Sequence, residues 1–429
     1  MTKANHKWYV LALLFVTYIF NIVDRHIINI LLEPIKIDLA LSDAQAGFLA
    51  GFAFAIFYTV MGVPIAVLAD RFNRAKLIAL CVALWTVMTA MTGAASNFVS
   101  MAVARMGVGV GEAGLTPSAN SLIGDVFKPN ERGRAIGIYH SAVPIGSMIA
   151  AFLGGTLGSY VGWRMTFIIL GVAGLLVAAL VRITLIEPPR GYLDDVSSTP
   201  EKEQYSVIET ATYLFRLKSC RYFMAAVALV GFVGNAINTW TPAFFMRTHE
   251  MNLMDMAIVV GTIGGIGGAI GMVAGGLVAD YYGSRDARSY MRIPAIALLT
   301  TLPLYSGVYL ASEPWMASGM LIAPVITGAI IFPPIITLLQ KLVKNNMRAV
   351  AVAILLLVLH LVGMGLGPLV VGLISDLLQP IYGTNSLRFA LLSVMPINLL
   401  AVWLFWRASN VILPDITHCV SDASTSSTI

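Results

Sequence analysis

Two ionisable residues, Arg105 and Glu112, stand in an otherwise apolar and glycine-rich stretch of the sequence. A charge at the centre of a bilayer costs roughly 2.5 to 3.5 kcal/mol in insertion measurements, so two charges in one span indicate a function inside the membrane. Seven residues separate them, which places both on one face of a helix, two turns apart. The intervening glycines at 107, 109 and 111 leave that face bare, so helices or a ligand can approach closely. This stretch predicts the floor of a transport site.

The composition is that of a polytopic membrane protein. Of the 429 residues, 58% are hydrophobic and 11% are charged, whereas about 25% are charged in an ordinary soluble domain. Three widely spaced cysteines offer neither a metal-binding spacing nor a disulfide framework, so we expect no metal and no cofactor. The basic N-terminus runs into an apolar stretch longer than that of a signal peptide, without a clear cleavage site, and should remain as the first helix.

Twelve apolar stretches are long enough to cross a bilayer as helices, which takes roughly 20 residues each. They fall near 8–33, 45–69, 77–95, 98–127, 134–160, 165–187, 221–246, 256–280, 292–311, 315–340, 348–378 and 387–408. We therefore predict an all-α polytopic membrane protein with twelve transmembrane helices.

The basic residues indicate how these helices are oriented. If the N-terminus is cytoplasmic, 21 of the 27 Lys and Arg residues lie on the inner side and 4 on the outer side, while Arg25 and Arg105 lie within spans. This asymmetry satisfies the positive-inside rule and predicts that both termini are cytoplasmic, in the plasma membrane, which in a bacterium is the inner membrane. Topology explains the net charge of +5, so no nucleic acid is expected as a partner.

An internal repeat divides the chain into two pseudo-symmetric halves. The segment Ala66–Arg74 after the second span reappears after the eighth as Gly276–Arg285, at an offset of 210 residues. Two six-helix bundles with a substrate site near the midplane between them are the architecture of an alternating-access transporter. The predicted regions are an N-terminal bundle at 1–187, a cytoplasmic linker at 188–218, a C-terminal bundle at 219–410 and a disordered cytoplasmic tail at 411–429.

These motifs carry a family resemblance. The repeated segment resembles the Gly-x-x-x-Asp-Arg-x-Gly-Arg-Lys loop of the major facilitator superfamily, more closely at Gly276–Arg285 than at Ala66–Lys76. Arg105–Ala113, together with Asp24-Arg25 on the first helix and Trp240-x-Pro242 on the seventh, is similar to the spinster branch, in particular to a bacterial spinster homologue. The resemblance implies the major facilitator fold and an amphipathic lipid substrate, such as a lysophospholipid or sphingosine phosphate.

The intramembrane charges suit a proton path. The span limits place Asp24, Arg25 and Arg105 roughly 12 Å below the outer surface and Glu112 roughly 21 Å below it, at about 1.5 Å per residue. We predict that Asp24 and Glu112 take up and release protons, and that Arg25 or Arg105 binds an anionic substrate group. Burial favours the neutral form of a carboxyl group and a nearby arginine favours the charged form, so an arginine drawn to substrate would promote proton uptake. A static ion-pair network is the alternative.

Other residues are predicted to contact the substrate or to gate the site. The predicted substrate contacts are Tyr58 on the second helix, His140 on the fifth, and Asn235, Asn238 and Trp240 on the seventh. For the aromatic residues the alternative is contact with lipid or other helices, and for His140 it is polar packing. Pro242 frees a backbone carbonyl and permits a kink, so we expect the seventh helix to bend as a gate.

A second gate is expected at the cytoplasmic face. Its predicted members are Asp70, Arg71, Arg74, Asp280 and Arg285. Asp70 can pair with a neighbouring arginine or oppose the positive N-terminal end of the eleventh helix, which would latch the inner side shut in the outward-open state. A solvated turn is the alternative.

These observations favour a proton-coupled secondary transporter, which we expect to be a monomer with a lipid or small-molecule substrate, protons and membrane lipids as partners. The alternative is a proton-coupled permease or exporter of small organic anions or drugs, which would use the same arginines. The sequence has no phosphate-binding Gly-x-x-x-x-Gly-Lys-Ser/Thr loop for ATP-driven pumping, and no His-Glu-x-x-His or Gly-x-Ser-x-Gly motif of an intramembrane enzyme. A channel or a receptor-like sensor would not need the duplicated loop motif.

Overall fold

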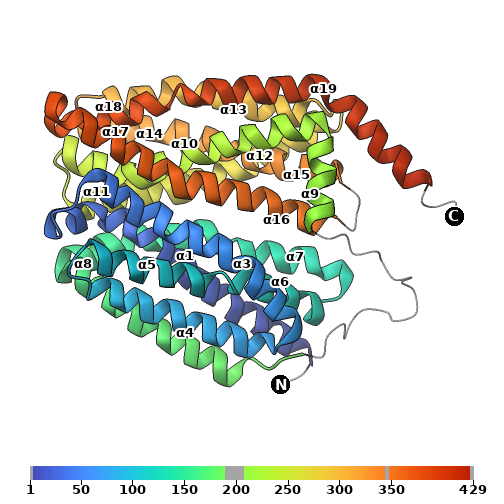
Figure 1. The fold of residues 1–429 in the computed structure, drawn as a ribbon, viewed down its shortest axis with the longest axis horizontal. Coiled ribbons are helices and arrows are strands. Elements are labelled where there is room, and N and C mark those ends of the chain that lie inside the picture. Colours follow the sequence, from blue (N-terminus) through green and yellow to red (C-terminus); the bar gives the residue numbers. More distant parts are fainter. Residues whose placement is uncertain (1–2, 189–206, 344–346, 426–429) are drawn as a thin grey trace. The chain divides into compact units, whose positions relative to one another are not determined.

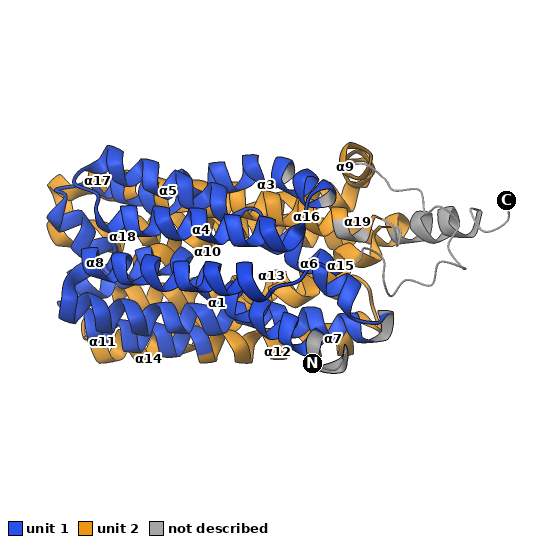
Figure 2. Cartoon of the chain, turned by 90° about the horizontal axis from the view of Figure 1, so that it is seen from below, with its two compact units in different colours: residues 1–199, 241–265 blue, residues 200–240, 266–429 orange. Residues whose placement is uncertain are grey.

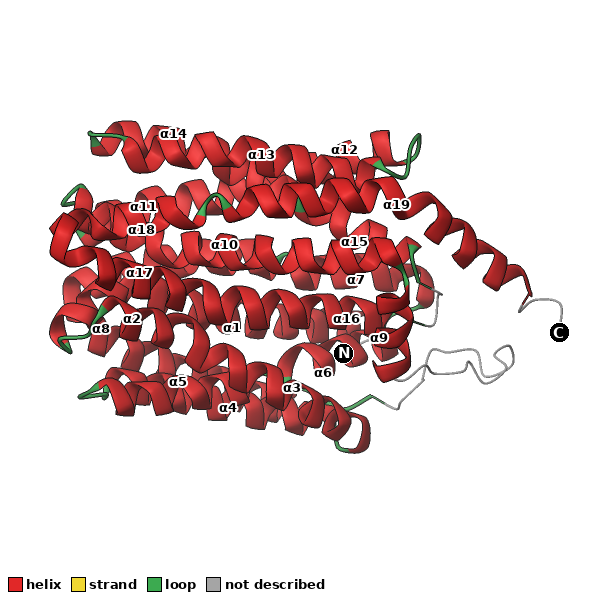
Figure 3. Cartoon of the chain, turned by 45° about the horizontal axis from the view of Figure 1, so that its top comes forward, coloured by secondary structure: helices red, strands yellow, loops and turns green. Residues whose placement is uncertain are grey.

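The computed structural model describes residues 3–188, 207–343 and 347–425, and every regular element in this part of the chain is a helix (Figure 1). The chain separates into two compact units (Figure 2). One unit comprises residues 1–199 and 241–265, and the other comprises residues 200–240 and 266–429. Short loops join most consecutive helices within each unit (Figure 3).

The first unit holds most of the predicted charged site. Its elements are α1 (Lys3–Asp38), α2 (Asp43–Gly47), the π-helical η1 (Phe48–Phe52), α3 (Ala53–Arg71), α4 (Arg74–Gly93), α5 (Phe98–Glu112), α6 (Leu115–Val126), α7 (Pro129–His140), α8 (Ala142–Thr184) and α11 (Leu253–Thr262). The end of α10 (Lys218–Thr248) also belongs to this unit, whereas its first part belongs to the second.

The second unit is built from the remaining helices. They are α9 (Val207–Arg216), α12 (Gly268–Gly283), α13 (Ser289–Leu310), α14 (Pro314–Ile330), α15 (Phe332–Lys341), α16 (Arg348–Val358), the π-helical η3 (Leu359–Leu366), α17 (Gly367–Tyr382), the short η4 (Gly383–Asn385), α18 (Ser386–Val394) and α19 (Ile397–Thr425). The π-helical η2 (Ile263–Gly267) lies where the chain passes between the units.

The helices accommodate the twelve predicted crossings. Ten helical stretches of the described residues are long and apolar enough to span a membrane. Two of them, Glu131–Thr184 with 54 residues and Val350–Asp415 with 66, are each long enough for two crossings. Gly162, with φ of +78° and ψ of 166°, breaks α8 between the predicted fifth and sixth spans. Glycine suits this break because it has no Cβ to oppose a positive φ.

Glycines let α5 lie against the backbones of α3 and α4. A Cβ atom added at Gly109 would lie 2.6 Å from the backbone oxygen of Phe54, and one added at Gly111 would lie 2.7 Å from the backbone nitrogen of Trp85. Side chains therefore do not fit at these two positions. The bare face predicted from the sequence serves helix packing here, and it brings the charges of α5 next to α3 and α4.

The end of the chain differs from the prediction. The prediction of a disordered tail from residue 411 is wrong as far as Asp415, because α19 continues through this segment to Thr425. Ile412 is fully buried, and the Asp415 carboxylate accepts a hydrogen bond of 2.8 Å from the backbone N–H of Ser219. Residues 189–206 of the predicted linker and residues 426–429 of the predicted tail lie outside the described part of the chain.

Replacing Gly109 by Ala is expected to lower the melting temperature of the detergent-solubilised protein. The added methyl group must displace the α3 backbone, and overpacking of this kind costs typically about 1–3 kcal/mol. Gly124→Ala on α6 is the matched control, because nothing lies within 4 Å of a Cβ at that position. Alanine is the better helix former, so the control should melt at the parent temperature or above it. Equal melting temperatures of the two variants would contradict a tight crossing.

Candidate functional site

Arg25 and Glu112 form a buried ion pair in the first unit. Arg25 on α1 donates two hydrogen bonds to Oε2 of Glu112, the last residue of α5, from Nε at 3.1 Å and from Nη2 at 2.8 Å. The Glu112 side chain is 0% exposed and that of Arg25 is 10% exposed. The sequence placed Glu112 deeper than Arg25, but α1 continues past the predicted end at 33 to Asp38, and this extension makes the two residues level.

Asp24 and Arg105 complete the charged cluster. Asp24 accepts a hydrogen bond from the Thr89 hydroxyl on α4, while its Oδ1 atom is buried without a hydrogen-bond partner among the described residues. Arg105 is 1% exposed, and its Nε and Nη1 atoms are likewise buried and without a partner in that part of the chain. Arg105 interacts electrostatically with both Asp24 and Glu112. Buried arginine donors without acceptors are costly, which makes this cluster suited to an additional anionic group.

Aromatic rings on α3 form a wall beside the arginines. The guanidinium carbon Cζ of Arg25 lies 4.9 Å from the ring centroid of Phe54 and 4.7 Å from that of Tyr58. The Cζ atom of Arg105 lies 5.7 Å from the Phe54 ring. Cation–π contacts of this kind leave the N–H groups in the guanidinium plane able to donate to an anion. The structure therefore brings the predicted contact Tyr58 to the charged cluster, together with Phe54.

His140 lies in the same unit, at the end of α7. It is exposed and contacts Tyr18 and Tyr139 edge-on, with centroid distances of 5.8 and 5.2 Å. The rings of Tyr18 and Tyr139 stack at 4.5 Å. Tyr18 also interacts electrostatically with Arg25 and Glu112, so it connects His140 to the ion pair. Tyr18 could not be predicted from the sequence, because one tyrosine in an apolar helix has no distinctive pattern.

The predicted substrate contacts on α10 belong to the second unit. Trp240 is fully buried and donates from Nε1 to the carbonyl oxygen of Pro368 at 2.9 Å. The Asn235 side chain donates to the carbonyl of Gly231 one turn earlier, at 2.9 Å, and Asn238 is exposed. The Trp240 ring thus packs α10 against α17 in this conformation.

Arg74 forms a buried charge network at the start of α4. It forms ion pairs with Asp125 on α6 at 2.5 Å and with Glu187 after α8 at 2.7 Å, and it is 2% exposed. Its hydrogen bond to the Ser121 hydroxyl, at 2.7 Å, adds to this network. The first residue of α4 therefore holds the ends of α6 and α8 together. The sequence analysis missed these pairs because their members lie far apart in the chain.

The other predicted gating residues lie at helix ends or inside α10. Arg71 and Asp280 are exposed, as is Arg285, whose Cζ atom lies 4.0 Å from the Tyr281 ring centroid. Pro242 lies inside α10, next to the point where the chain passes from one unit to the other. The Asp70 side chain lies outside the described part of the structure, so the cytoplasmic latch stays a prediction.

A second buried charge cluster joins the far end of α1 to the end of α10 within the first unit. Arg247 donates to both carboxylate oxygens of Asp43, at 2.8 and 2.7 Å, and from Nε to Glu33 at 2.6 Å. Lys36 pairs with Asp43 at 2.6 Å. We call these four residues the α1–α10 cluster. The sequence placed Lys36 and Arg247 among the outer loop charges and Glu33 at the end of the first span, and no local pattern connects Asp43 with Arg247, 204 positions away.

Comparisons with known proteins agree with the fold and the motifs. Residues 14–368 match the family model of the Major Facilitator Superfamily. The chain is 32% identical to an MFS-type efflux pump of Mycolicibacterium smegmatis, covering 94% of this chain and 93% of that protein. It is 24% identical to the sphingosine-1-phosphate transporter SPNS2 of Danio rerio, covering 86% and 76%. A solved bacterial homologue of the human lysosomal transporter spinster, inward-facing and unoccupied, matches with TM-score 0.88, 30% identity and coverage of 96% and 98%.

The chain therefore belongs to the major facilitator superfamily. Within that superfamily it is a transporter of the spinster type, which confirms the resemblance seen in the sequence motifs. The predictions of an all-helical, multi-pass membrane protein and of a non-enzymatic transporter are confirmed as well.

Replacing Arg247 by Met is expected to destabilise the protein strongly. Asp43 and Glu33 would keep their buried charges with less compensation, and removal of one partner of a buried ion pair costs about 3–5 kcal/mol. The double variant Arg247→Met/Asp43→Asn should lose less than the sum of the two single changes, measured as melting temperatures in one detergent. Asp38→Asn is the control. The side chains of Asp38 and its partner Arg164 are 47% and 40% exposed, and an exposed ion pair of this kind contributes about 1 kcal/mol or less to stability. Additive single changes would contradict coupling in the α1–α10 cluster.

Proposed function

We propose that this protein moves an amphipathic anionic lipid, a lysophospholipid or a sphingosine-phosphate-like molecule, across the membrane by proton-coupled alternating access. The observation that carries the proposal is the buried Arg25–Glu112 ion pair beside Arg105 and Asp24. Four charges kept in a membrane-spanning bundle are expensive, which favours a transport role over a purely structural one.

The coupling follows from competition for Arg25. A phosphate or carboxylate of the substrate can take the donors that Arg25 directs at Glu112. Glu112 then loses its counter-charge while it stays buried, and burial favours the neutral acid, so it takes up a proton. Substrate and proton binding therefore favour each other, and by linkage the effect is reciprocal. When Arg25 returns to Glu112, both the substrate and the proton are released.

Asp24 is the second proton-coupling carboxylate in this proposal. The Thr89 hydroxyl orients one of its oxygens, and the positive charge of Arg105 acts on it from α5. An anion bound by Arg105 would offset part of the positive charge that acts on Asp24. Asp24 would then favour its neutral form, as Glu112 does when the substrate takes Arg25. The two carboxylates thus belong to one coupled site, in which either Arg25 or Arg105 can bind the anionic group of the substrate.

An amphipathic substrate agrees with the mixed chemistry of the site. Arg25 and Arg105 suit an anionic head group, and the rings of Phe54 and Tyr58 offer an apolar surface beside it. The similarity to a protein named as a sphingosine-1-phosphate transporter supports a lipid of this class. The further proposed contacts are His140, Asn235, Asn238 and Trp240.

The proposal includes the setting of the transporter. The protein works as a monomer in the bacterial inner membrane, with both termini in the cytoplasm, as the distribution of Lys and Arg favours. The inward-open and outward-open states interconvert by bending of α10 at Pro242 and by opening of a cytoplasmic gate. The proposed members of this gate are Asp70, as the latch, and Arg71, Asp280 and Arg285 of the repeated loops. The protons and the surrounding membrane lipids are its other partners.

Glu112→Gln is expected to lower substrate accumulation driven by a proton gradient in proteoliposomes, because an amide cannot take up the coupled proton and only Asp24 remains to do so. Exchange of labelled for unlabelled substrate at equal pH should persist, since the amide preserves the shape of the site. Glu131→Gln, whose partner Lys7 lies near the start of α1, is the matched control and should accumulate substrate like the parent. Full gradient-driven accumulation by Glu112→Gln would remove Glu112 from the coupling role.

Arg25→Gln and Arg105→Gln are expected to weaken binding of a lysophospholipid, measured by ligand-induced thermal shift. Hydrogen bonds to charged groups contribute about 1.5–3 kcal/mol, so each loss should raise Kd about 10- to 100-fold. Arg182→Gln, in the exposed last turn of α8, is the control and should bind like the parent. Unchanged affinity in both site variants would contradict the assignment of the arginines.

The second candidate function is proton-coupled movement of small organic anions or drugs. It is favoured by the similarity to a protein named as an MFS-type efflux pump. The thermal-shift experiment separates the candidates when a sugar acid is tested beside the lysophospholipid. A shift with the sugar acid and none with the lysophospholipid would replace the lipid proposal with this second one.

A further inference from the structure

The short helix α9 lies across the ends of the long helices of the second unit. Figure 1 shows it running crosswise to α10 and α16 at the end where α10 begins. It ends at Arg216, and α10 starts at Lys218. The candidate membrane spans of the described residues do not include α9. Because α10 is a candidate membrane span, α9 lies next to the end of a span.

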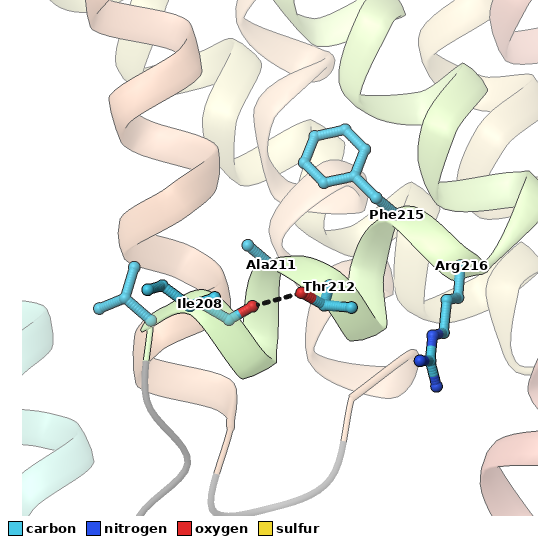
Figure 4. Close-up of a pocket in the computed structure, with 6 residues that line it drawn as sticks. Ile208, Ala211, Thr212, Phe215 and Arg216 are labelled. Atoms are coloured by element: carbon cyan, nitrogen blue, oxygen red, sulfur yellow. Dashed lines mark hydrogen bonds between the residues drawn. The ribbon is translucent and has the colours of Figure 1, made fainter.

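The residues of α9 form three distinct faces. Thr210 and Leu214 are fully buried, and Leu214 is part of the unit's hydrophobic core. A second face carries Ile208, which is 79% exposed, and Phe215, which is 50% exposed. The third face is polar and includes Arg216, which points away from Phe215 in Figure 4. A helix that lies in the membrane interface needs this arrangement, with one side toward protein, one toward acyl chains and one toward water.

The apolar and polar faces of α9 meet in an open hollow of about 540 Å³. Its lining residues are Val207, Ile208, Ala211, Thr212, Phe215 and Arg216 (Figure 4). Apolar groups supply most of this lining, and Arg216 is its one charged residue. This lining complements a phospholipid, because its apolar residues match the acyl chains and its arginine matches the phosphate.

The charges around α9 favour an anionic partner. Arg216, Lys218 and Arg221 are all exposed, against one exposed acidic residue in the same stretch, Glu209. Basic residues next to a membrane span are attracted to anionic phospholipid head groups, and their aliphatic stems can lie along apolar surface. Lipid head groups surround every span of a membrane protein, so such a partner is always within reach of α9.

We propose that α9 is an interfacial helix that binds anionic phospholipids of the adjoining leaflet. Ile208 and Phe215 insert among the upper acyl chains, and Arg216 and Lys218 contact the phosphates. The helix would thereby fix the level of the second unit in the bilayer at the start of α10. This inference is independent of the transported substrate and of proton coupling.

The test uses the full chain in nanodiscs of phosphatidylglycerol and phosphatidylcholine, with Cys419 replaced by Ser. A bimane label is attached through Ile208→Cys, Phe215→Cys or Thr212→Cys, the last being the matched control on the polar face. Melting temperatures equal to that of the parent establish that each variant is folded. Quenching by lipids brominated in the upper acyl chain is compared with quenching by aqueous iodide.

We expect brominated lipid to quench the labels at 208 and 215 several-fold more than the label at 212, and iodide to show the reverse order. Brominated phosphatidylglycerol should quench position 215 more than brominated phosphatidylcholine, and Arg216→Gln/Lys218→Gln should remove this difference. Iodide quenching at 208 and 215 equal to that at 212 would overturn the proposal. Equal quenching by the two brominated lipids in the parent would do so too. Protection of 208 and 215 from both quenchers would overturn it in favour of coverage by another part of this chain or by a second copy.

Discussion

The ion pair between Arg25 and Glu112 is the interaction on which the rest of the first unit depends. Two opposite charges inside a membrane bundle are tolerable only together, because either one alone would be buried without compensation. One carboxylate oxygen accepts both hydrogen bonds from Arg25, so the pair holds α1 and α5 at one level. An interaction that is costly to break without a replacement, yet exchangeable for a substrate anion, has the properties that coupling requires.

The surrounding helices make this pair possible. Gly109 and Gly111 allow α5 to touch the backbones of α3 and α4, and this close packing puts Phe54 and Tyr58 beside the guanidinium groups. The α1–α10 cluster then ties the far end of α1 to α10 through Arg247, and Arg74 ties α4 to the ends of α6 and α8. The buried charges of the first unit thus occur in separate groups along its helices, each balanced by partners from other elements.

Much of this arrangement could be predicted from residue types and spacing. The apolar stretches predicted the crossings, the repeated loop predicted the family, and charges in apolar surroundings predicted which residues would gather. The pairing within the cluster could not be predicted, because it depends on where α1 ends, and the apolar segment gave no sign that the helix continues to Asp38.

Other features could not be predicted from the sequence, because they depend on contacts between distant segments. Asp43 and Arg247 are separated by 204 residues, and nothing local distinguishes them from loop charges. The burial of Trp240 depends on the carbonyl of Pro368, 128 residues away. The continuation of α19 as far as Asp415 is supported by the hydrogen bond from the backbone N–H of Ser219, at the start of α10. A residue type fixes what a side chain is able to do, whereas the fold decides which partner it meets.

The central claim is that substrate takes Arg25 from Glu112, which then binds a proton. Infrared difference spectroscopy of the reconstituted protein, with and without a lysophospholipid, tests it directly. The claim predicts that substrate produces a carbonyl band of protonated carboxylic acid, which its downshift in D2O distinguishes from the ester band of the lipid. The Glu112 component of this band should be missing in Glu112→Gln, whereas the Asp24 component remains. A spectrum without the band, or a band that persists unchanged in Glu112→Gln, would contradict it.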